Sequence, residues 1–288
     1  MVGKSLKKWW PVFVLPTFAA FVIGFLWPFI WGIYLSFCRF TTVSDVEFVG
    51  LDNYKKLLNP VYNQNFGHAF WLTVLFAFLS TILINVFGFL IALALTGKFK
   101  GVNTFRTVFF MPNLIGGIVL GYIWNTLVNG LLVSFGTHLT LKTSGIAGFW
   151  GLTTLLLWQQ IGYMMIIYIA GLNNVSPDLI EAAKIDGANV WQTLIKVKIP
   201  MIMPSITICT FLTLTNGFKL FDQNLALTAG EPKKMTELLA LNIYNTYYGR
   251  AGRIWMGLGQ AKAVIFFVLV VGIALIQLRF TSRRETQA

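Results

Sequence analysis

The sequence has 288 residues, of which 56% are hydrophobic and only 11% are charged, and its mean hydropathy is +0.71. A soluble domain of this length carries about 25% charged residues, so the composition excludes an ordinary soluble protein and indicates a membrane protein. The net charge of +12 does not indicate a nucleic-acid-binding surface. Its lysines and arginines are scattered between apolar segments, where they report membrane topology.

Residues that commonly carry out chemistry are sparse and isolated. Cys38, Cys209, His68 and His138 lie far apart, and none has a second ligand at a metal-type spacing. The sequence contains no GxxxxGK[ST] phosphate-binding loop and no Ser/His, Asp/Asp or HExxH constellation in its apolar segments. We therefore expect no catalytic residue, no metal site and no cofactor bound by this chain.

Six apolar segments are long enough to cross a bilayer, whose core of about 30 Å requires about 20 helical residues. We expect these spans near 11–37, 69–95, 105–128, 149–172, 201–221 and 260–280. The predicted fold class is an all-α polytopic membrane protein in which residues 1–288 form a single transmembrane domain. The first span is too long for the apolar core of a signal peptide, and Pro16 and Pro28 predict kinks in it.

Polar and small residues within the spans are few. Lys219 and Asp222 fall at the end of the fifth span and Lys262 at the start of the sixth, where snorkelling to the interface is the simplest account. Gly117 and Gly121 form a G-x-x-x-G pair in the third span, which we expect to pack against another helix of the same chain rather than form a dimer seam.

Two segments between the spans are long, 38–68 and 222–259. The first contains FVGLDNYKKLLNP, which predicts a short amphipathic helix, and the second contains the turn signal TAGEP followed by MTELLALNIYNTYY, which predicts a second surface helix. Both segments are candidates for contact with an extracytoplasmic partner, with structural capping of the helix bundle as the alternative.

Positive charge in short loops predicts the orientation. The N-terminus, the second and fourth loops and the C-terminus together hold 12 of the 22 basic residues but only four of the 10 acidic ones. The other connecting segments hold nine basic and six acidic residues. We therefore expect both termini, and the loop 173–200, on the cytoplasmic side of the membrane.

The loop 173–200 has the features of two short helices joined at a glycine. Ser176 is suited to cap a helix near 177–185, and Gly187 allows a sharp turn after it. The second helix carries apolar residues that we expect to pack on the base of the membrane domain, namely Trp191, Leu194 and Ile195. From these features alone, the loop is either a docking knob for a soluble partner or an ordinary connection between spans.

The segment EAAKIDGANVWQTLIKVKIP, residues 181–200, resembles the EAA loop of ABC importer permeases, written EAA-x3-G-x9-I-x-L-P. Val197 and Ile199 replace the usual Ile and Leu. Nearly the whole chain is similar to the carbohydrate-uptake branch of binding-protein-dependent permeases, through blocks such as MPNLIGGIVLGYIWNTLVNG and GFKLFDQNLALTAGEP. The chain departs from that branch at Glu231, where a second glycine is usual, and at Leu194, where a phenylalanine is usual.

The resemblance implies a type I ABC importer permease in the plasma membrane of a bacterium or an archaeon. Its partners would be a second homologous permease, two ATPase subunits that bind ATP and Mg, an extracytoplasmic sugar-binding protein and the lipid bilayer. Coupling to the ATPase would involve Glu181, Ala182, Ala183, Asp186, Gly187 and Pro200. The implied cargo is a di- or oligosaccharide, with a glycerol-phosphate ester or another polyol as an alternative. An ion-coupled carrier is less consistent, since neither internal repeats nor deeply buried charges are evident.

A sugar site within a membrane requires hydrogen-bonding groups and an aromatic face that converge from several helices. The resemblance places such contacts on the fourth and fifth spans. The residues at these places are Gln159, Gln160, Tyr163, Thr213, Asn216, Gly217 and Leu220. At about 3.6 residues per turn each set lies on one helical face. Ordinary polar packing between helices remains the alternative for each of them.

Overall fold

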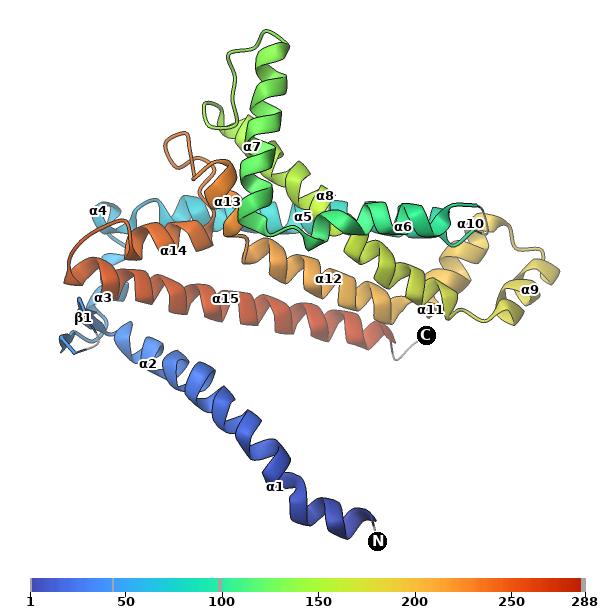
Figure 1. The fold of residues 1–288 in the computed structure, drawn as a ribbon, viewed down its shortest axis with the longest axis horizontal. Helices are drawn as coiled ribbons and strands as arrows, with labels where there is room; N and C mark the ends of the chain where they lie inside the picture. Colours follow the sequence, from blue (N-terminus) through green and yellow to red (C-terminus); the bar gives the residue numbers. More distant parts are fainter. Residues whose placement is uncertain (1, 43, 98–99, 286–288) are drawn as a thin grey trace. The chain divides into compact units, whose positions relative to one another are not determined.

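The computed structural model describes residues 2–42, 44–97 and 100–285, with side chains described from Trp9 to Thr281 outside the gaps. Several basic residues used to predict the orientation fall outside the described residues or side chains, namely Lys4, Lys7, Lys8, Lys98, Arg283 and Arg284. Helices make up most of the described structure (Figure 1), which confirms the all-α class. A hairpin of two short strands is the exception in the described ranges.

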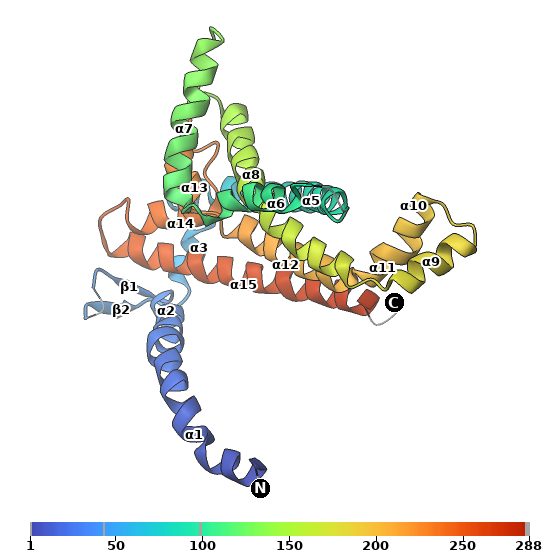
Figure 2. The same ribbon diagram turned by 45° about the vertical axis from the view of Figure 1, so that its right-hand side comes forward.

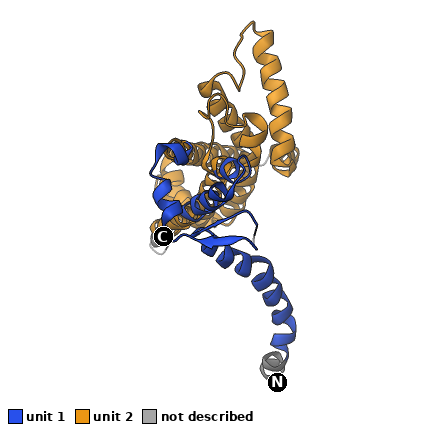
Figure 3. Ribbon diagram, turned by 90° about the vertical axis from the view of Figure 1, so that its left-hand side faces the viewer, with its two compact units in different colours: residues 1–64, 243–266 blue, residues 65–242, 267–288 orange. Residues whose placement is uncertain are grey.

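Within the single domain expected from the sequence, the structure distinguishes two compact units (Figure 3). Unit 1 comprises residues 1–64 and 243–266, and unit 2 comprises residues 65–242 and 267–288. Five helices in the described residues are long and apolar enough to span a membrane, and a bent helix pair can supply a sixth.

The first span belongs to unit 1 and is apolar from Trp9 to Leu35. It consists of α1 (Val2–Phe21), a π-helical segment (Val22–Leu26) and α2 (Trp27–Leu35). Pro28 has no N–H group, and the N–H of the preceding Trp27 bonds to the carbonyl of Val22, five residues back. The disturbance expected at Pro28 is thus a local widening of the helix.

A small folded region follows the first span in unit 1. Strands β1 (Cys38–Phe40) and β2 (Val46–Phe48) pair antiparallel. The short helix expected in FVGLDNYKKLLNP is α3 (Asp52–Lys56), and a further short helix, α4 (Pro60–Asn63), follows it. The buried Asn53 donates from Nδ2 to the carbonyl oxygens of Ser36 and Cys38 at 2.9 and 2.8 Å. These bonds fix α3 against the start of the hairpin.

Helix α15 (Arg253–Glu285) contains the sixth span and begins in unit 1, after α14 (Leu239–Tyr247). Lys262 is fully buried, and its Nζ donates to the carbonyl oxygen of Asn63 at 3.0 Å and to Thr246 Oγ1 at 2.8 Å. The snorkelling expected for Lys262 is therefore wrong. A buried ammonium requires such acceptors, because its charge is otherwise costly away from water.

Three helices form the centre of unit 2: α5 (Phe66–Leu95), α8 (Gly145–Asn173) and α12 (Met203–Phe218). A buried hydrogen-bond network joins all three. Tyr168 on α8 donates to Asn85 Oδ1 on α5 at 2.6 Å, and Asn85 Nδ2 donates to Thr213 Oγ1 on α12 at 2.8 Å. In an apolar environment such interhelical bonds fix the register of the helices.

The expected third span, 105–128, is not one helix. The chain forms α6 (Val102–Phe110), a 3₁₀ turn (Met111–Leu114) and α7 (Gly117–Ser134), and only α7 qualifies as a candidate span. Pro112 and the Gly116–Gly117 pair explain the break, because proline cannot donate to a helical bond and glycine weakens a helix. The expected packing of the G-x-x-x-G pair within the chain is confirmed, since Gly121 faces Ala226 of α13 (Asp222–Leu227).

The fifth span, expected at 201–221, is also interrupted. The helical stretch Val190–Met201 and α12 meet at Ile202 with a bend of 72°. Pro204 explains the bend, because it has no N–H group and its ring would clash with the carbonyl of Pro200 in a continuous helix. A π-helical segment, Leu194–Lys198, precedes Pro200 just as one precedes Pro28.

Helix α6 approaches α8 closely at Gly162, where a Cβ atom would overlap the carbonyl of Phe109. We predict that Gly162→Ala destabilises the chain by about 1–3 kcal/mol, because backbone must move to admit the methyl group. Thermal unfolding of the purified chain in detergent would measure this. Gly130→Ala on α7 is the matched control, since a Cβ there meets nothing within 4 Å. Equal midpoints for the two variants would contradict the proposed close packing.

Candidate functional site

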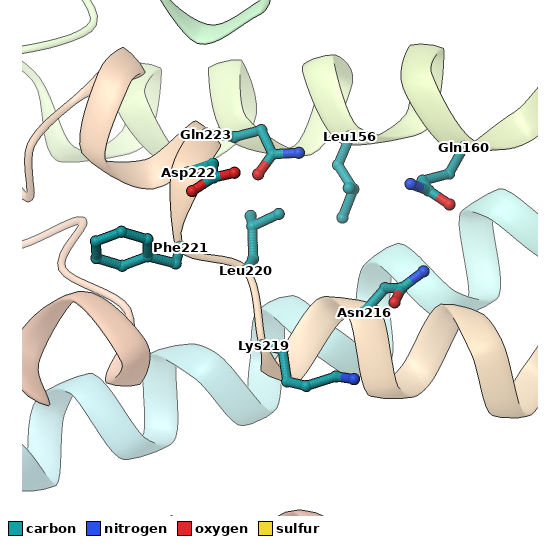
Figure 4. Close-up of a pocket in the computed structure, with 8 residues that line it drawn as sticks. All are labelled: Leu156, Gln160, Asn216, Lys219, Leu220, Phe221, Asp222 and Gln223. Carbon is teal, nitrogen blue, oxygen red and sulfur yellow. The ribbon is translucent and has the colours of Figure 1, made fainter. Parts of the chain in front are cut away.

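An open cavity of about 380 Å³ lies within unit 2, between α8, the end of α12 and the start of α13 (Figure 4). Eight residues line it: Leu156, Gln160, Asn216, Lys219, Leu220, Phe221, Asp222 and Gln223. In Figure 4, Leu156 and Gln160 come from α8 and Asn216 comes from α12, while the remaining residues lie at or beyond the end of α12. The cavity therefore combines two helical walls with one stretch of irregular chain.

The irregular stretch is Lys219–Phe221, between the last residue of α12 and the first of α13. Lys219 caps α12, and Phe221 has φ −123° and ψ −59°, outside the usual helical and extended values. Non-helical backbone at membrane depth is tolerated where it lines a water-filled cavity, because water satisfies its polar groups. The end of α12 thus determines where the cavity forms.

Three of the seven residues considered for substrate contact line this cavity: Gln160, Asn216 and Leu220. The other four pack elsewhere in unit 2. Gln159 and Thr213 are buried and hydrogen-bonded, Gly217 fits tightly against Ala77, and the Tyr163 ring packs against Phe110 with centroids 6.4 Å apart. Helical periodicity alone did not separate these two groups.

The third wall of the cavity, formed by the residues that follow α12, was mostly missed in the sequence analysis. Lys219 and Asp222 were interpreted as interfacial charges, and Phe221 and Gln223 were not singled out, yet all four line the cavity. The signal that could have found them is the run of polar residues immediately after the fifth span, in GFKLFDQN.

The cavity presents both charges and neutral amides. Lys219 and Asp222 are exposed in the described structure, and they offer one positive and one negative group. Gln160 is partly buried, and its Oε1 has no hydrogen-bond partner in the described part of the chain. Because the two charges offset each other, the wall suits a ligand that is neutral and rich in hydrogen-bonding groups.

A second candidate site is the loop that follows α8. Helix α9 (Pro177–Ile185) has the predicted bounds, and Ser176 Oγ accepts from the N–H of Asp178 at 3.3 Å, as expected of an N-cap. Gly187 has φ +81°, which confirms the predicted turn. The N–H groups of Gly187 and Ala188 bond to the carbonyls of Lys184 and Ala183, as in a Schellman motif.

The next turn, α10 (Val190–Thr193), begins with a capping box that the sequence analysis missed. Asn189 accepts from the Gln192 N–H at 2.8 Å, and Gln192 Oε1 accepts from the Asn189 N–H at 2.8 Å. The pattern N-x-x-Q was a recognisable signal for it. The two caps and the glycine turn together make the loop a defined structure.

The loop exposes an unusual amount of apolar surface. The exposed fractions of Ile185, Val190 and Trp191 are 86%, 84% and 70%. The expected packing of Trp191 and Ile195 on the membrane domain is therefore wrong. Helix α10 is a single turn that buries only Thr193 and leaves Val190 and Trp191 exposed. Figures 1 and 2 show α9 and α10 extending beyond the adjacent ends of α8 and α12.

The six residues expected to couple to an ATPase belong to this loop. Glu181, Ala182, Asp186 and Gly187 are exposed, whereas Ala183 and Pro200 are partly buried. The exposed acidic groups therefore lie on the same short segment as the apolar side chains. An exposed apolar patch with a polar rim is typical of a surface that binds another protein.

The long apolar helices define a multi-pass membrane protein, and the names of its relatives make it a transport subunit rather than an enzyme. Comparison with known proteins agrees: residues 84–286 match the family of binding-protein-dependent transport system inner membrane components, and the chain belongs to that family. It is a permease of the ABC importer class, located in the inner or plasma membrane.

Two relatives illustrate the family. A probable starch degradation products transport system permease of Thermoanaerobacterium thermosulfurigenes is 42% identical over 97% of this chain and 96% of its own length. A multiple sugar-binding transport system permease of Streptococcus mutans is 31% identical over 99% of both. A bacterial ABC transporter involved in the import of the acidic polysaccharide alginate has the same fold, with a TM-score of 0.80, 22% identity and 98% coverage of both chains.

We predict that Gly187→Ala loosens the loop locally, because a left-handed conformation costs an L-residue about 1–2 kcal/mol. In Gly187→Ala, hydrogen exchange of peptides covering 183–190 should accelerate by about 5–30-fold. The acceleration should be larger in Gly187→Val. Ala188→Val is the control, because it adds bulk at a neighbouring residue whose φ is not positive. Unchanged exchange in both Gly187 variants would show that the turn is not under this constraint.

Proposed function

We propose that this chain is one permease of an ATP-driven importer for a di- or oligosaccharide and that it works by alternating access. The observation that carries the proposal is the placement of the two sites on one structural element. Helix α12 begins at Met203, shortly after the loop 173–200 (the docking loop), and ends at Phe218 beside the cavity. Its 16 residues make a rod of about 24 Å, which can transmit movement of the loop to the cavity wall.

The chemistry that drives the movement belongs to partner subunits in this proposal. The chain has no phosphate-binding loop, so ATP and Mg are bound by two ATPase subunits. Each ATPase receives a loop such as 173–200, with Glu181 and Asp186 as charged contacts and Ile185, Val190 and Trp191 as apolar ones. Closure of the ATPase pair on ATP moves the loops together and opens the cavity to the other side of the membrane.

The remaining partners follow from the family and the topology. A second, homologous permease completes the transmembrane pathway, and we favour a different chain over a second copy of this one. A soluble extracytoplasmic sugar-binding protein delivers the cargo. Both termini and the docking loop face the cytoplasm, in agreement with the excess of basic residues there, and the host is a bacterium or an archaeon.

A sugar is the cargo that the cavity supports best. Amide groups from Gln160, Asn216 and Gln223 can exchange hydrogen bonds with hydroxyl groups, and Phe221 offers an aromatic face. The names of the two relatives, which refer to starch degradation products and to multiple sugars, support the same class. The pair of opposite charges on Lys219 and Asp222 favours a neutral oligosaccharide over a phosphate ester.

We predict that Asn216→Ala raises the apparent KM for uptake about tenfold, because a lost hydrogen bond to substrate is worth about 1 kcal/mol or somewhat more. Uptake of radiolabelled maltotriose into proteoliposomes that contain the complete transporter measures the change. Thr215→Ala is the matched control, since Thr215 bonds within its own helix to the carbonyl of Phe211 at 2.8 Å. Normal uptake by Asn216→Ala would remove this residue from the site.

We predict that Glu181→Lys uncouples the permease from its ATPase, because the docking surface then carries the opposite charge. The full chain is purified in nanodiscs from its host, and the accompanying proteins are identified. Wild-type chain should recover an ATPase, a second permease and a sugar-binding protein, whereas Glu181→Lys should lose the ATPase and Glu181→Gln should retain part of it. Recovery of the wild-type chain alone would overturn the multi-subunit proposal.

A further inference from the structure

Gln159 connects a backbone carbonyl in the broken third span to a side chain of the cavity wall. Its Nε2 donates to the carbonyl oxygen of Ile115 at 3.0 Å, and its Oε1 accepts from Nε2 of Gln223 at 2.7 Å. Gln159 is only 5% exposed and Gln223 only 9%, so water competes little for either bond. Gln159 itself does not line the cavity, but Gln223 does.

The carbonyl of Ile115 needs this partner. Ile115 has extended backbone, with φ −88° and ψ 129°, and precedes Gly116, the N-cap of α7. Its oxygen is therefore outside the hydrogen-bond ladder of α7. Within an apolar membrane domain an unsatisfied carbonyl is costly, and the donor that reaches it comes from α8.

A carbonyl can only accept, and this fixes the direction of both bonds. The Gln159 amide must turn its N–H group toward Ile115 and its oxygen toward Gln223. Gln223 must then turn its own N–H group toward Gln159, and its Oε1 is left for the cavity. A reversed amide at either glutamine would place two acceptors or two donors against each other.

Close packing holds together the two ends of this series of hydrogen bonds, Ile115 and Gln223. A Cβ atom at Gly117 would lie 2.8 Å from Asp222 Cβ and 2.9 Å from Gln223 Cδ, so the start of α7 lies directly against the start of α13. The break in the third span therefore packs directly against this cavity wall. Rotation of the Gln223 side chain away from Gln159 has little room.

We propose that Gln159 is a positioning residue: through it, the Ile115 carbonyl fixes Gln223 Oε1 as a hydrogen-bond acceptor on the cavity wall. The inference rests on the proposed function for the identity of the transported molecule. Gln160 adds a second amide oxygen, unpartnered in the described structure, and Asp222 adds a carboxylate. This side of the cavity therefore recognises a neutral molecule that donates several hydroxyl groups, and disfavours a phosphate or carboxylate group, which would place acceptors against acceptors.

The orientation of Gln223 can be tested without any substrate. In the full-length chain, purified in nanodiscs with the subunits that accompany it, ¹⁵N-labelled glutamine side chains are followed by NMR during exchange into D₂O. The Gln223 signal is assigned by its loss in Gln223→Met. Its NH₂ group should exchange at least about tenfold more slowly than that of free glutamine under the same conditions. Exchange in the wild type at the rate of free glutamine would overturn the proposal.

Three variants separate orientation from simple packing. Gln159→Met should abolish the protection of Gln223, while Gln160→Met, at the neighbouring position, should leave it intact. Gln159→Glu should also retain it, because a protonated carboxyl group in an apolar site offers one donor to Ile115 and one acceptor to Gln223. Protection that persists in Gln159→Met would contradict the positioning role.

The functional consequence is measured as uptake of maltotriose by the complete transporter. Gln159→Met and Gln223→Met should each raise KM about tenfold at nearly unchanged kcat, the double variant should be no worse than either, and Gln159→Glu should restore the wild-type KM. An unchanged KM in Gln159→Met beside a raised one in Gln223→Met would count against the inference. Failure of the wild type to take up maltotriose bears on the proposed cargo instead, and amide exchange then decides the orientation.

Discussion

The constraint on which the structure depends is the cost of an unpaired backbone group in an apolar layer. The first, third and fifth spans expected from the sequence are not uninterrupted helices, and their interruptions are satisfied in three different ways. Before Pro28 and Pro200 the helix widens, so that a neighbouring N–H reaches the carbonyl five residues back. At Ile115 a glutamine from another helix supplies the donor. At Lys219–Phe221 the chain borders an open cavity.

The placement of the irregular segments explains the placement of the sites. A continuous fifth helix would have no free end inside unit 2, and the cavity would lose Lys219, Phe221 and Asp222 from its wall. The 72° bend at Ile202 turns the docking loop away from the axis of α12. One helix therefore carries a binding surface at one end and a cavity at the other, and the interruptions on either side of it set their directions.

Much of the architecture could be predicted from sequence because hydropathy and capping are local. The bounds of α9 followed from Ser176, Pro177 and Gly187, whose effects act within one turn. The break in the third span was missed because the span was placed by its average hydropathy alone. Its local signals are Pro112 and the Gly116–Gly117 pair, which interrupt the helix within the apolar segment.

The candidate site was predicted only in part, for a geometric reason. Successive helical residues are about 100° apart, so Gln160 faces the cavity while Gln159 faces Ile115 and Gln223. A sequence pattern identifies two polar residues but not which neighbour each will meet. The third wall comprises Lys219–Phe221 and the start of α13, so the helical periodicity of α12 does not extend to it.

The exposed apolar side chains of the docking loop have a consequence for the life of the protein before assembly. Ile185, Val190 and Trp191 present to water the kind of surface that chaperones bind and proteases select. In the proposed assembly, a permease synthesised in excess of the subunit that covers this loop would be recognised as incomplete and degraded. The residues proposed to join the subunits would then also set their stoichiometry in the cell, by limiting the lifetime of unassembled chains.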